Sequence, residues 1–443
     1  MIKWRRVDEI ITYYGKGVTP KYVEDSSIIV LNQKCIRNNK IDFSFAQFID
    51  DKKSYNEDKF LRIGDLLVNS TGQGTAGRVA MIDYIPEGYK IIVDSHILVL
   101  RTNNFFESKC LNYSLFSIES MLQTFMDGST GQGEFDKVRL FNVKVGYPID
   151  NITQQKIAAV LSSLDDKIEL NNKINIELEA MAKTLYDYWF VQFDFPNKEG
   201  KPYKSSGGKM VYNPILKREI PVGWEVKTIG DYCRSTGGFA FKSSWWTNEG
   251  DPVIKIKDIQ ENYTIDLSDL SYVDLSDKKV DEKFIAKPGN ILIAMTGATV
   301  GKYAIVPYTN NDLYVNQRVG YFNLGNNPVL RLPFLINSLN QPYFREAIFT
   351  LASGAAQPNI SNEQINNISL IIPIKDLIDK YNQHISDFYK RILLNQTQNQ
   401  ELAQLRDWLL PMLMNGQVKV EDTYTSSEPQ TNLAAEATTA YQN

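Results

Sequence analysis

Residues 153–190 read TQQKIAAVLSSLDDKIELNNKINIELEAMAKTLYDYWF, and their pattern of apolar side chains predicts one long helix. Apolar residues and two asparagines recur at alternating steps of four and three, which is the spacing of a coiled-coil seam. The seam positions are Ile157, Leu161, Leu164, Ile168, Asn171, Asn175, Leu178, Ala182, Leu185 and Trp189. A helix of this length would run about 55 Å.

A second stretch, residues 376–412, repeats this seam and its asparagines. Asn395 and Asn399 correspond to Asn171 and Asn175, 224 positions earlier. If the two helices pack antiparallel about a pseudo-two-fold axis, the asparagines near their midpoints face one another and fix the register. The alternative is two unrelated amphipathic helices, each packed on its own domain.

The segments that precede the two helices are also similar to each other in sequence. GDLLVNSTGQGTAGRVAMI at residues 64–82 recurs as GNILIAMTGATVGKYAIV at residues 289–306, about 225 positions later. Two further segments keep nearly the same offset: VDSHILVL at 93–100 over VNQRVGYF at 315–322, and GSTGQG at 128–133 over GAAQPN at 354–359. The chain is therefore expected to be an internal duplication of one globular module followed by one helix.

Gly72, Gly74 and Gly77 form a G-x-G-x-x-G pattern, which in another context would indicate a dinucleotide site. That site needs a helix after the glycines. The residues after Gly77 alternate in polarity and include β-branched side chains. This pattern predicts a strand, with the glycines in a hairpin-like loop before it. The second copy also loses the glycine spacing. A nucleotide-dependent enzyme is therefore disfavoured.

The composition excludes several other classes of protein. The 443 residues include three cysteines without C-x-x-C spacing and two histidines far apart. No disulfide framework, zinc site or histidine-based catalytic triad is expected. We therefore predict no catalytic and no metal-binding residues. No apolar run reaches membrane-spanning length and the first residues do not read as a signal peptide, which predicts a cytoplasmic protein. The formal net charge of −4 indicates that any basic groove is local.

The layout, with QQKIAAVLSSLDDKIELNNKINIELEAMAKTLYDYWFVQFDFP and GWEVKTIGDYC, closely resembles the specificity (S) subunit of type I restriction-modification enzymes, up to about Val420. The resemblance implies an α+β fold with two β-rich mixed α/β target-recognition domains and two long helices that form an antiparallel coiled coil, in a pseudo-two-fold repeat. The expected parts are a first recognition domain at 1–150, a central conserved helix at 151–190, a linker at 191–221, a second recognition domain at 222–375, a C-terminal conserved helix at 376–415 and a disordered tail at 416–443.

The resemblance also implies a function. Each recognition domain would read one half of a bipartite, asymmetric site in double-stranded DNA, and the helices would dock methyltransferase (M) subunits, two per chain, to which restriction (R) subunits can add. The chain itself would be non-catalytic and bind no cofactor. S-adenosylmethionine, with ATP and Mg²⁺ if a restriction subunit is present, would be used by those partners in a bacterial or archaeal cytoplasm. The competing interpretation is a tandem-module coiled-coil adaptor that binds proteins rather than DNA.

The residues that would contact DNA are inferred from chemistry, because polar side chains on loops and strand ends read base edges. For each of them the alternative is an ordinary turn residue. In the first copy the candidates are Thr71, Gln73, Thr75, Arg78, Ser95, His96, Ser129, Thr130 and Gln132. In the second copy they are Thr296, Thr299, Lys302, Gln317, Arg318, Gln357 and Asn359.

Overall fold

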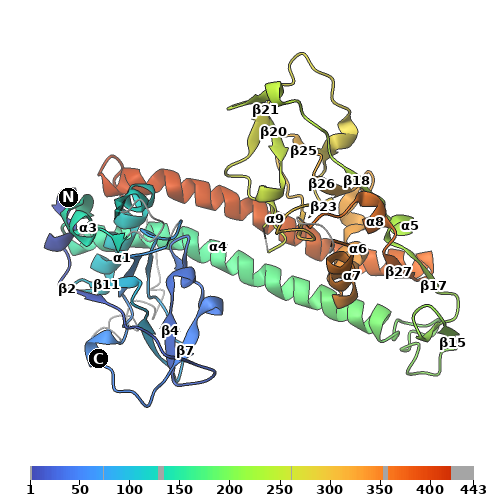
Figure 1. Ribbon diagram of the computed structural model, residues 1–443, viewed down its shortest axis with the longest axis horizontal. Coiled ribbons are helices and arrows are strands. Elements are labelled where there is room, and N and C mark those ends of the chain that lie inside the picture. The colour runs from blue at the N-terminus through green and yellow to red at the C-terminus, as the bar shows by residue number, and fades with distance from the viewer. Residues whose placement is uncertain (1, 73, 128–133, 261, 353–357, 421–443) are drawn as a thin grey trace, which may run out of the picture. The chain divides into compact units, whose positions relative to one another are not determined.

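The computed structural model describes residues 2–72, 74–127, 134–260, 262–352 and 358–420 (Figure 1). The chain divides into two compact units. Unit 1 comprises Met1–Asp166 with Leu402–Asn443, and unit 2 comprises Lys167–Glu401. Each unit therefore contains one globular module and parts of both long helices.

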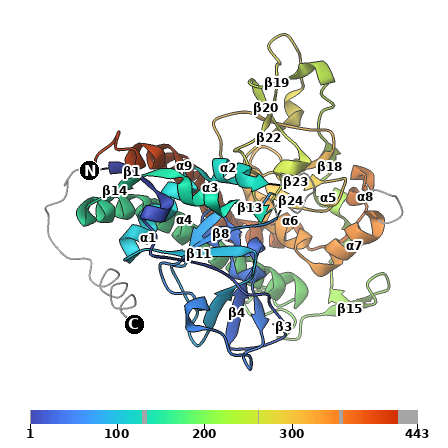
Figure 2. The same ribbon diagram turned by 60° about the vertical axis from the view of Figure 1, so that its left-hand side comes forward.

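Unit 1 is built on two four-stranded sheets. The first has the order β2 (Tyr13–Lys16), β11 (Ile97–Arg101), β8 (Leu66–Asn69), β9 (Val79–Met81), and all its neighbours are antiparallel. The second has the order β10 (Lys90–Val93), β4 (Ile28–Leu31), β7 (Gln47–Ile49), β3 (Tyr22–Val23), with β10 parallel to β4. β1 (Ile2–Arg6) pairs with β14 (Lys144–Pro148), so the module begins and ends at one place (Figure 2).

Unit 2 repeats this plan with different residues. Its first sheet has the order β18 (Ser235–Gly237), β26 (Val319–Phe322), β23 (Ile291–Ala294), β24 (Tyr303–Ile305). Its second has the order β19 (Trp246–Thr247), β21 (Ser271–Val273), β20 (Asp251–Ile254), β25 (Leu313–Val315), β22 (Ile285–Ala286), with β20 parallel to β25. β17 (Glu225–Thr228) pairs with β27 (Ser369–Ile372), as β1 does with β14. The duplicated module predicted from the sequence is confirmed.

Shorter elements complete both units. The helices are α1 (Phe105–Phe116), α2 (Glu119–Leu122), α3 (Lys137–Asn142), α5 (Ile229–Tyr232), α6 (Leu332–Leu339), α7 (Pro342–Ala352) and α8 (Asn362–Asn366). Four further two-residue strands lie outside the sheets above: β5 (Ile36–Arg37), β6 (Lys40–Ile41), β12 (Met126–Asp127) and β13 (Glu134–Phe135). Among the residues that the structure describes, no helix is long and apolar enough to cross a membrane.

A glycine marks the same backbone crossing in each unit. A Cβ atom at Gly17 would lie 2.0 Å from the carbonyl oxygen of Asp94, and one at Gly238 would lie 2.2 Å from that of Val315. Val18 bridges Asp94, and Phe239 bridges Asn316. Only a residue without a side chain lets the chain pass this close to the neighbouring strand.

The long helices are α4 (Asn151–Tyr186), which continues into a π-helical turn at Asp187–Val191, and α9 (Lys375–Met414). Within unit 2 they run antiparallel, because Asn175 contacts Asn395 while Ala182, further along α4, accepts a hydrogen bond from Tyr381. Within unit 1 the start of α4 and the end of α9 share one core, through Ile157, Leu161, Leu410, Leu413 and Met414.

The four seam asparagines form two hydrogen-bonded pairs inside unit 2. Asn171 donates to Asn399 at 2.8 Å, and Asn395 donates to Asn175 at 2.8 Å. Asn171 therefore contacts Asn399 rather than Asn395, its equivalent in the repeat. The two hydrogen bonds are equivalent, because the repeat relates Asn171 to Asn395 and Asn399 to Asn175. Asn171 and Asn395 are 0% and 1% exposed, so their side-chain N–H groups donate to the partner helix rather than to water, while Oδ1 of Asn171 is buried without a hydrogen-bond partner.

Residues 191–221, expected as a linker, form an ordered part of unit 2. β15 (Met210–Asn213) and β16 (Arg218–Pro221) make an antiparallel hairpin. Phe195 stacks on Tyr203 and on Trp224, with ring centroids 4.6 and 5.3 Å apart. The aromatic residues between the glycines and lysines therefore fix this segment against the core of unit 2.

Candidate nucleic-acid interface

Three segments that are distant in the sequence of unit 1 meet at one point. The backbone N–H of Ser70, after β8, donates to the carbonyl of His96 at 2.7 Å. The N–H of Phe135, at the end of the second predicted loop, donates to the carbonyl of Ser70 at 3.0 Å. The glycine loop, the turn before β11 and the segment that follows residues 128–133 are therefore held together by the backbone.

Unit 2 repeats these bonds at the equivalent residues. The N–H of Met295 donates to the carbonyl of Arg318 at 3.3 Å, and the N–H of Ile360 donates to the carbonyl of Met295 at 2.9 Å. Thr296 and Asn359 form an isolated β-bridge at the same place. Among the described residues, Ser70, His96 and Phe135 of unit 1 and Met295, Arg318 and Ile360 of unit 2 are therefore joined in the same way.

The glycine loops connect antiparallel strands, as predicted. In unit 1, β8 pairs with β9, and the N–H of Gly77 donates to the carbonyl of Asn69. In unit 2, β23 pairs with β24, and the N–H of Gly301 donates to the carbonyl of Ala294. No helix follows the glycines at either place, since β9 and β24 do. The dinucleotide cradle is excluded by this geometry.

Side chains of unit 1 form a short hydrogen-bonded chain at the convergence point. The hydroxyl of Thr71 donates to Oε1 of Gln33 at 3.2 Å and lies 2.8 Å from Nδ1 of His96. Gln33 begins the 3₁₀ turn Gln33–Cys35 that follows β4. The sequence interpretation missed Gln33, which lies 38 positions before Thr71 and outside both glycine loops.

Two carboxylates near candidate residues, Asp94 and Glu119, are removed from solvent to different degrees: Asp94 is buried and Glu119 is half-buried. The N–H of His96 donates to Oδ1 of Asp94 at 2.9 Å. Burial raises the pKa of Asp94, and this hydrogen bond opposes the increase. Burial likewise raises the pKa of Glu119, which accepts a hydrogen bond from the N–H of Val79 and lies in the field of Arg78. Arg78 is thus placed next to a structural carboxylate.

The candidate residues differ in exposure. His96, Gln317, Arg318 and Asn359 are exposed, while Thr71, Thr75, Arg78, Ser95, Thr296, Thr299 and Lys302 are half-buried. The hydroxyl of Thr75 lies 3.2 Å from the carbonyl oxygens of both Thr71 and Gly72 and shares its single hydrogen between them, so it stabilises the turn itself. Gln73, Ser129, Thr130, Gln132 and Gln357 lie outside the described residues.

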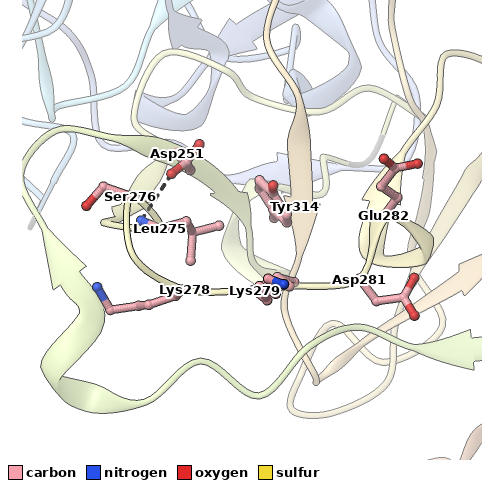
Figure 3. Close-up of a pocket in the computed structure, with 9 residues that line it drawn as sticks. Asp251, Leu275, Ser276, Lys278, Lys279, Asp281, Glu282 and Tyr314 are labelled. Atoms are coloured by element: carbon pink, nitrogen blue, oxygen red, sulfur yellow. Dashed lines mark hydrogen bonds between the residues drawn. The ribbon is translucent and has the colours of Figure 1, made fainter.

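A surface hollow lies on the second sheet of unit 2 (Figure 3). It is lined by Asp251 of β20, Tyr314 of β25 and residues 275–282, and the N–H of Leu275 donates to Asp251 at 3.2 Å. Its lining combines the carboxylates of Asp251, Asp281 and Glu282 with the ammonium groups of Lys278 and Lys279. Within the described part of the chain, no group of His, Cys, Asp and Glu is arranged to hold a metal ion.

The comparisons with known proteins agree with this architecture. The model of the type I restriction modification DNA specificity domain matches residues 2–180 and 221–404. The chain is 29% identical over 323 residues to the type I restriction enzyme MjaIX specificity subunit of Methanocaldococcus jannaschii, covering 70% of this chain and 69% of that protein. It is 26% identical over 448 residues to the HindI specificity subunit of Haemophilus influenzae, covering 88% and 94%.

Among solved structures, the S subunit of a type I restriction-modification system from M. genitalium matches with a TM-score of 0.51 and 16% identity. The match covers 93% of this chain and 96% of that one, and it supports the fold alone. The family match spans both globular modules and most of both long helices. The chain therefore belongs to the family of type I restriction modification DNA specificity domains.

Proposed function

We propose that this chain is the non-catalytic specificity subunit of a type I restriction-modification complex and that each unit reads one half of a bipartite, asymmetric DNA site. One observation carries the proposal. The same backbone hydrogen bonds bring the same three segments together in both units, but the side chains that they present differ. His96 stands in unit 1 where Arg318 stands in unit 2. Two units with equivalent backbone hydrogen bonds and different polar side chains are suited to bind two different DNA sequences.

The chemistry of the convergence points favours DNA over a protein partner. Their side chains are hydroxyls, amides, an imidazole and guanidinium or ammonium groups, which are the groups that read base edges in the major groove. Glycines at the loops allow the backbone to approach a phosphate closely. Because the chain is close to neutral, we expect partner subunits to supply much of the phosphate contact.

The exposed faces of the long helices support two copies of one protein partner. Leu170 and Met181 on α4 are 51% and 55% exposed, and Leu394 and Leu405 on α9 are 53% and 43% exposed. The second pair lies 224 positions after the first. Residues 11 apart return to nearly the same face of a helix. We propose that each pair contacts one methyltransferase subunit, that restriction subunits add to this assembly, and that S-adenosylmethionine, ATP and Mg²⁺ are bound by these partners in the cytoplasm.

The test is to co-express the chain with its cognate methyltransferase subunit and to map methylated positions across a bacterial genome. We expect a two-part motif with a fixed gap. Exchange of residues 1–150 for those of another family member should change one half of the motif, and exchange of residues 222–375 should change the other. A complex that forms but methylates no defined motif would favour the adaptor instead, and a change in both halves after one exchange would contradict the assignment of one reader to each half.

A further inference from the structure

The hydrogen-bonded chain Gln33–Thr71–His96 determines which nitrogen of His96 carries a proton. A threonine hydroxyl has one hydrogen, and that of Thr71 is donated to Oε1 of Gln33 at 3.2 Å. Both contacts are satisfied when the hydroxyl oxygen accepts at its second contact, 2.8 Å away, with Nδ1 of His96 as the donor. In a neutral imidazole with a proton on Nδ1, Nε2 has a free lone pair. The exposed edge of His96 therefore offers an acceptor.

Unit 2 offers the opposite polarity at the equivalent position. The backbone of Arg318 is placed as that of His96 is: its carbonyl accepts from Met295, and its N–H donates to Oδ1 of Asn316 at 3.4 Å, as His96 does to Asp94. Arg318 is exposed, and within the described ranges its guanidinium has no side-chain hydrogen bond or ion pair. A guanidinium is a donor only.

We infer that the two units read one equivalent position of their half-sites with opposite hydrogen-bond polarity. Nε2 of His96 accepts a hydrogen bond from the exocyclic amino group of adenine or cytosine, and Arg318 donates to O6 and N7 of guanine. These are the groups that the bases present in the major groove. The inference rests on the proposed function and deepens it. Thr71 and Gln33 act as positioning residues, because their hydrogen bonds hold the imidazole tautomer.

The experiment uses the complex of the full chain with its methyltransferase subunit and compares the methylated motifs of variants. His96→Arg replaces the acceptor with a donor at an exposed position. We expect one position in one half of the motif to become a guanine on the contacted strand, with discrimination against the original base of roughly 5- to 150-fold. The other half should be unchanged. Arg318→Gln should relax the guanine at the equivalent position of the other half and leave the first half intact.

The positioning role has its own readout. Thr71→Val removes the hydroxyl and frees the imidazole to present either a donor or an acceptor. We expect the motif to become degenerate at the position that His96→Arg changes, whereas Thr71→Ser should retain the original base. Degeneracy at a different position, or none at all, would contradict the tautomer argument. Circular dichroism and gel filtration of each complex establish that the variants are folded.

The two levels of proposal fail in different ways. If His96→Arg leaves both halves unchanged while exchange of residues 1–150 still alters one half, the inference about His96 is wrong and the proposed function stands. If the unmodified complex gives no two-part motif, the proposed function is wrong. A change from one specified base to adenine or thymine in His96→Arg would also overturn the polarity argument.

Discussion

Asn395 donates a single side-chain hydrogen bond, to Asn175, from a position that is 1% exposed. Asn395→Leu should destabilise the protein by about 1–3 kcal/mol, because it leaves the amide of Asn175 buried without this partner. The double variant Asn175→Leu with Asn395→Leu should recover most of that loss, since two apolar side chains then meet. Urea denaturation of the two singles and the double measures this coupling.

The control for this cycle is Asn172→Ala. Asn172 is exposed and accepts a hydrogen bond from Asn399. Its removal should change the unfolding free energy by no more than about 0.5 kcal/mol. Additive losses for the two single substitutions would show that the buried pair is not coupled.

Glu179 on α4 predicts a pH dependence of stability. Burial raises the pKa of this carboxyl to about 7. A folded pKa above the unfolded value means that stability is complete below the unfolded pKa and is lost as pH rises through the folded pKa. Glu179→Gln should therefore be more stable than the natural chain at pH 8, by of the order of 2 kcal/mol, and equal to it at pH 4. Thermal melting at both pH values, with exposed Glu177→Gln as control, checks the sign; a stabilisation that is the same at both pH values would contradict it.

At the scale of residues, the sequence predicts the roles of side chains that recur at equivalent positions of the two repeats. Asn171, Asn175, Asn395 and Asn399 could be found because the chain can be aligned with itself. Gln33 could not, since its role depends on a contact across 38 positions and on the direction of one hydroxyl. The candidate DNA contacts remain predictions for the same reason: composition of a loop does not say which side chain is used to hold the loop, as Thr75 is.

At the scale of elements, the crossing at Gly17 is expected to tolerate no side chain. Gly17→Ala places a Cβ atom 2.0 Å from a backbone carbonyl, so β2 must move away from β10. We expect a loss of about 3 kcal/mol or more in the free energy of unfolding. Gly88→Ala is the matched control: Gly88 has φ +81° and no atom within 4 Å of an added Cβ, so only backbone strain of about 1–2 kcal/mol is expected. Equal melting temperatures for the two variants would contradict this account.

The long helices and the hairpin loops could be predicted as elements because each has a periodic pattern. The order of strands could not be, since β10 pairs with β4 across a long stretch of chain. The hairpin of β15 and β16 was hidden by the glycine, serine and lysine content of residues 191–221. The segment is held in place by the stacking of Phe195 on Tyr203 and Trp224. This stacking cannot be predicted from the sequence, because it depends on the three-dimensional positions of the rings.

At the scale of the whole molecule, the exposed apolar pairs predict the stoichiometry of the complex. Leu170→Glu should leave one methyltransferase subunit bound per chain, Leu394→Glu should do the same, and the double variant should bind none. Native mass spectrometry of the co-expressed complexes measures this. Lys183→Glu is the control, because it is exposed on α4 but lies about 140° around the helix from Leu170. Retention of two methyltransferase subunits in the double variant would place the docking surface elsewhere.

The core of unit 1 contains Leu410, Leu413 and Met414, at the end of α9, beside residues from the start of the chain. During synthesis, the globular module of unit 1 therefore cannot complete its core until the ribosome has translated residues 167–401 and the last turns of α9. A stop codon just before Leu410 would spare every residue of Lys167–Glu401 and damage the module that was made first. Truncations near the C-terminus should therefore destabilise the N-terminal globular module of unit 1.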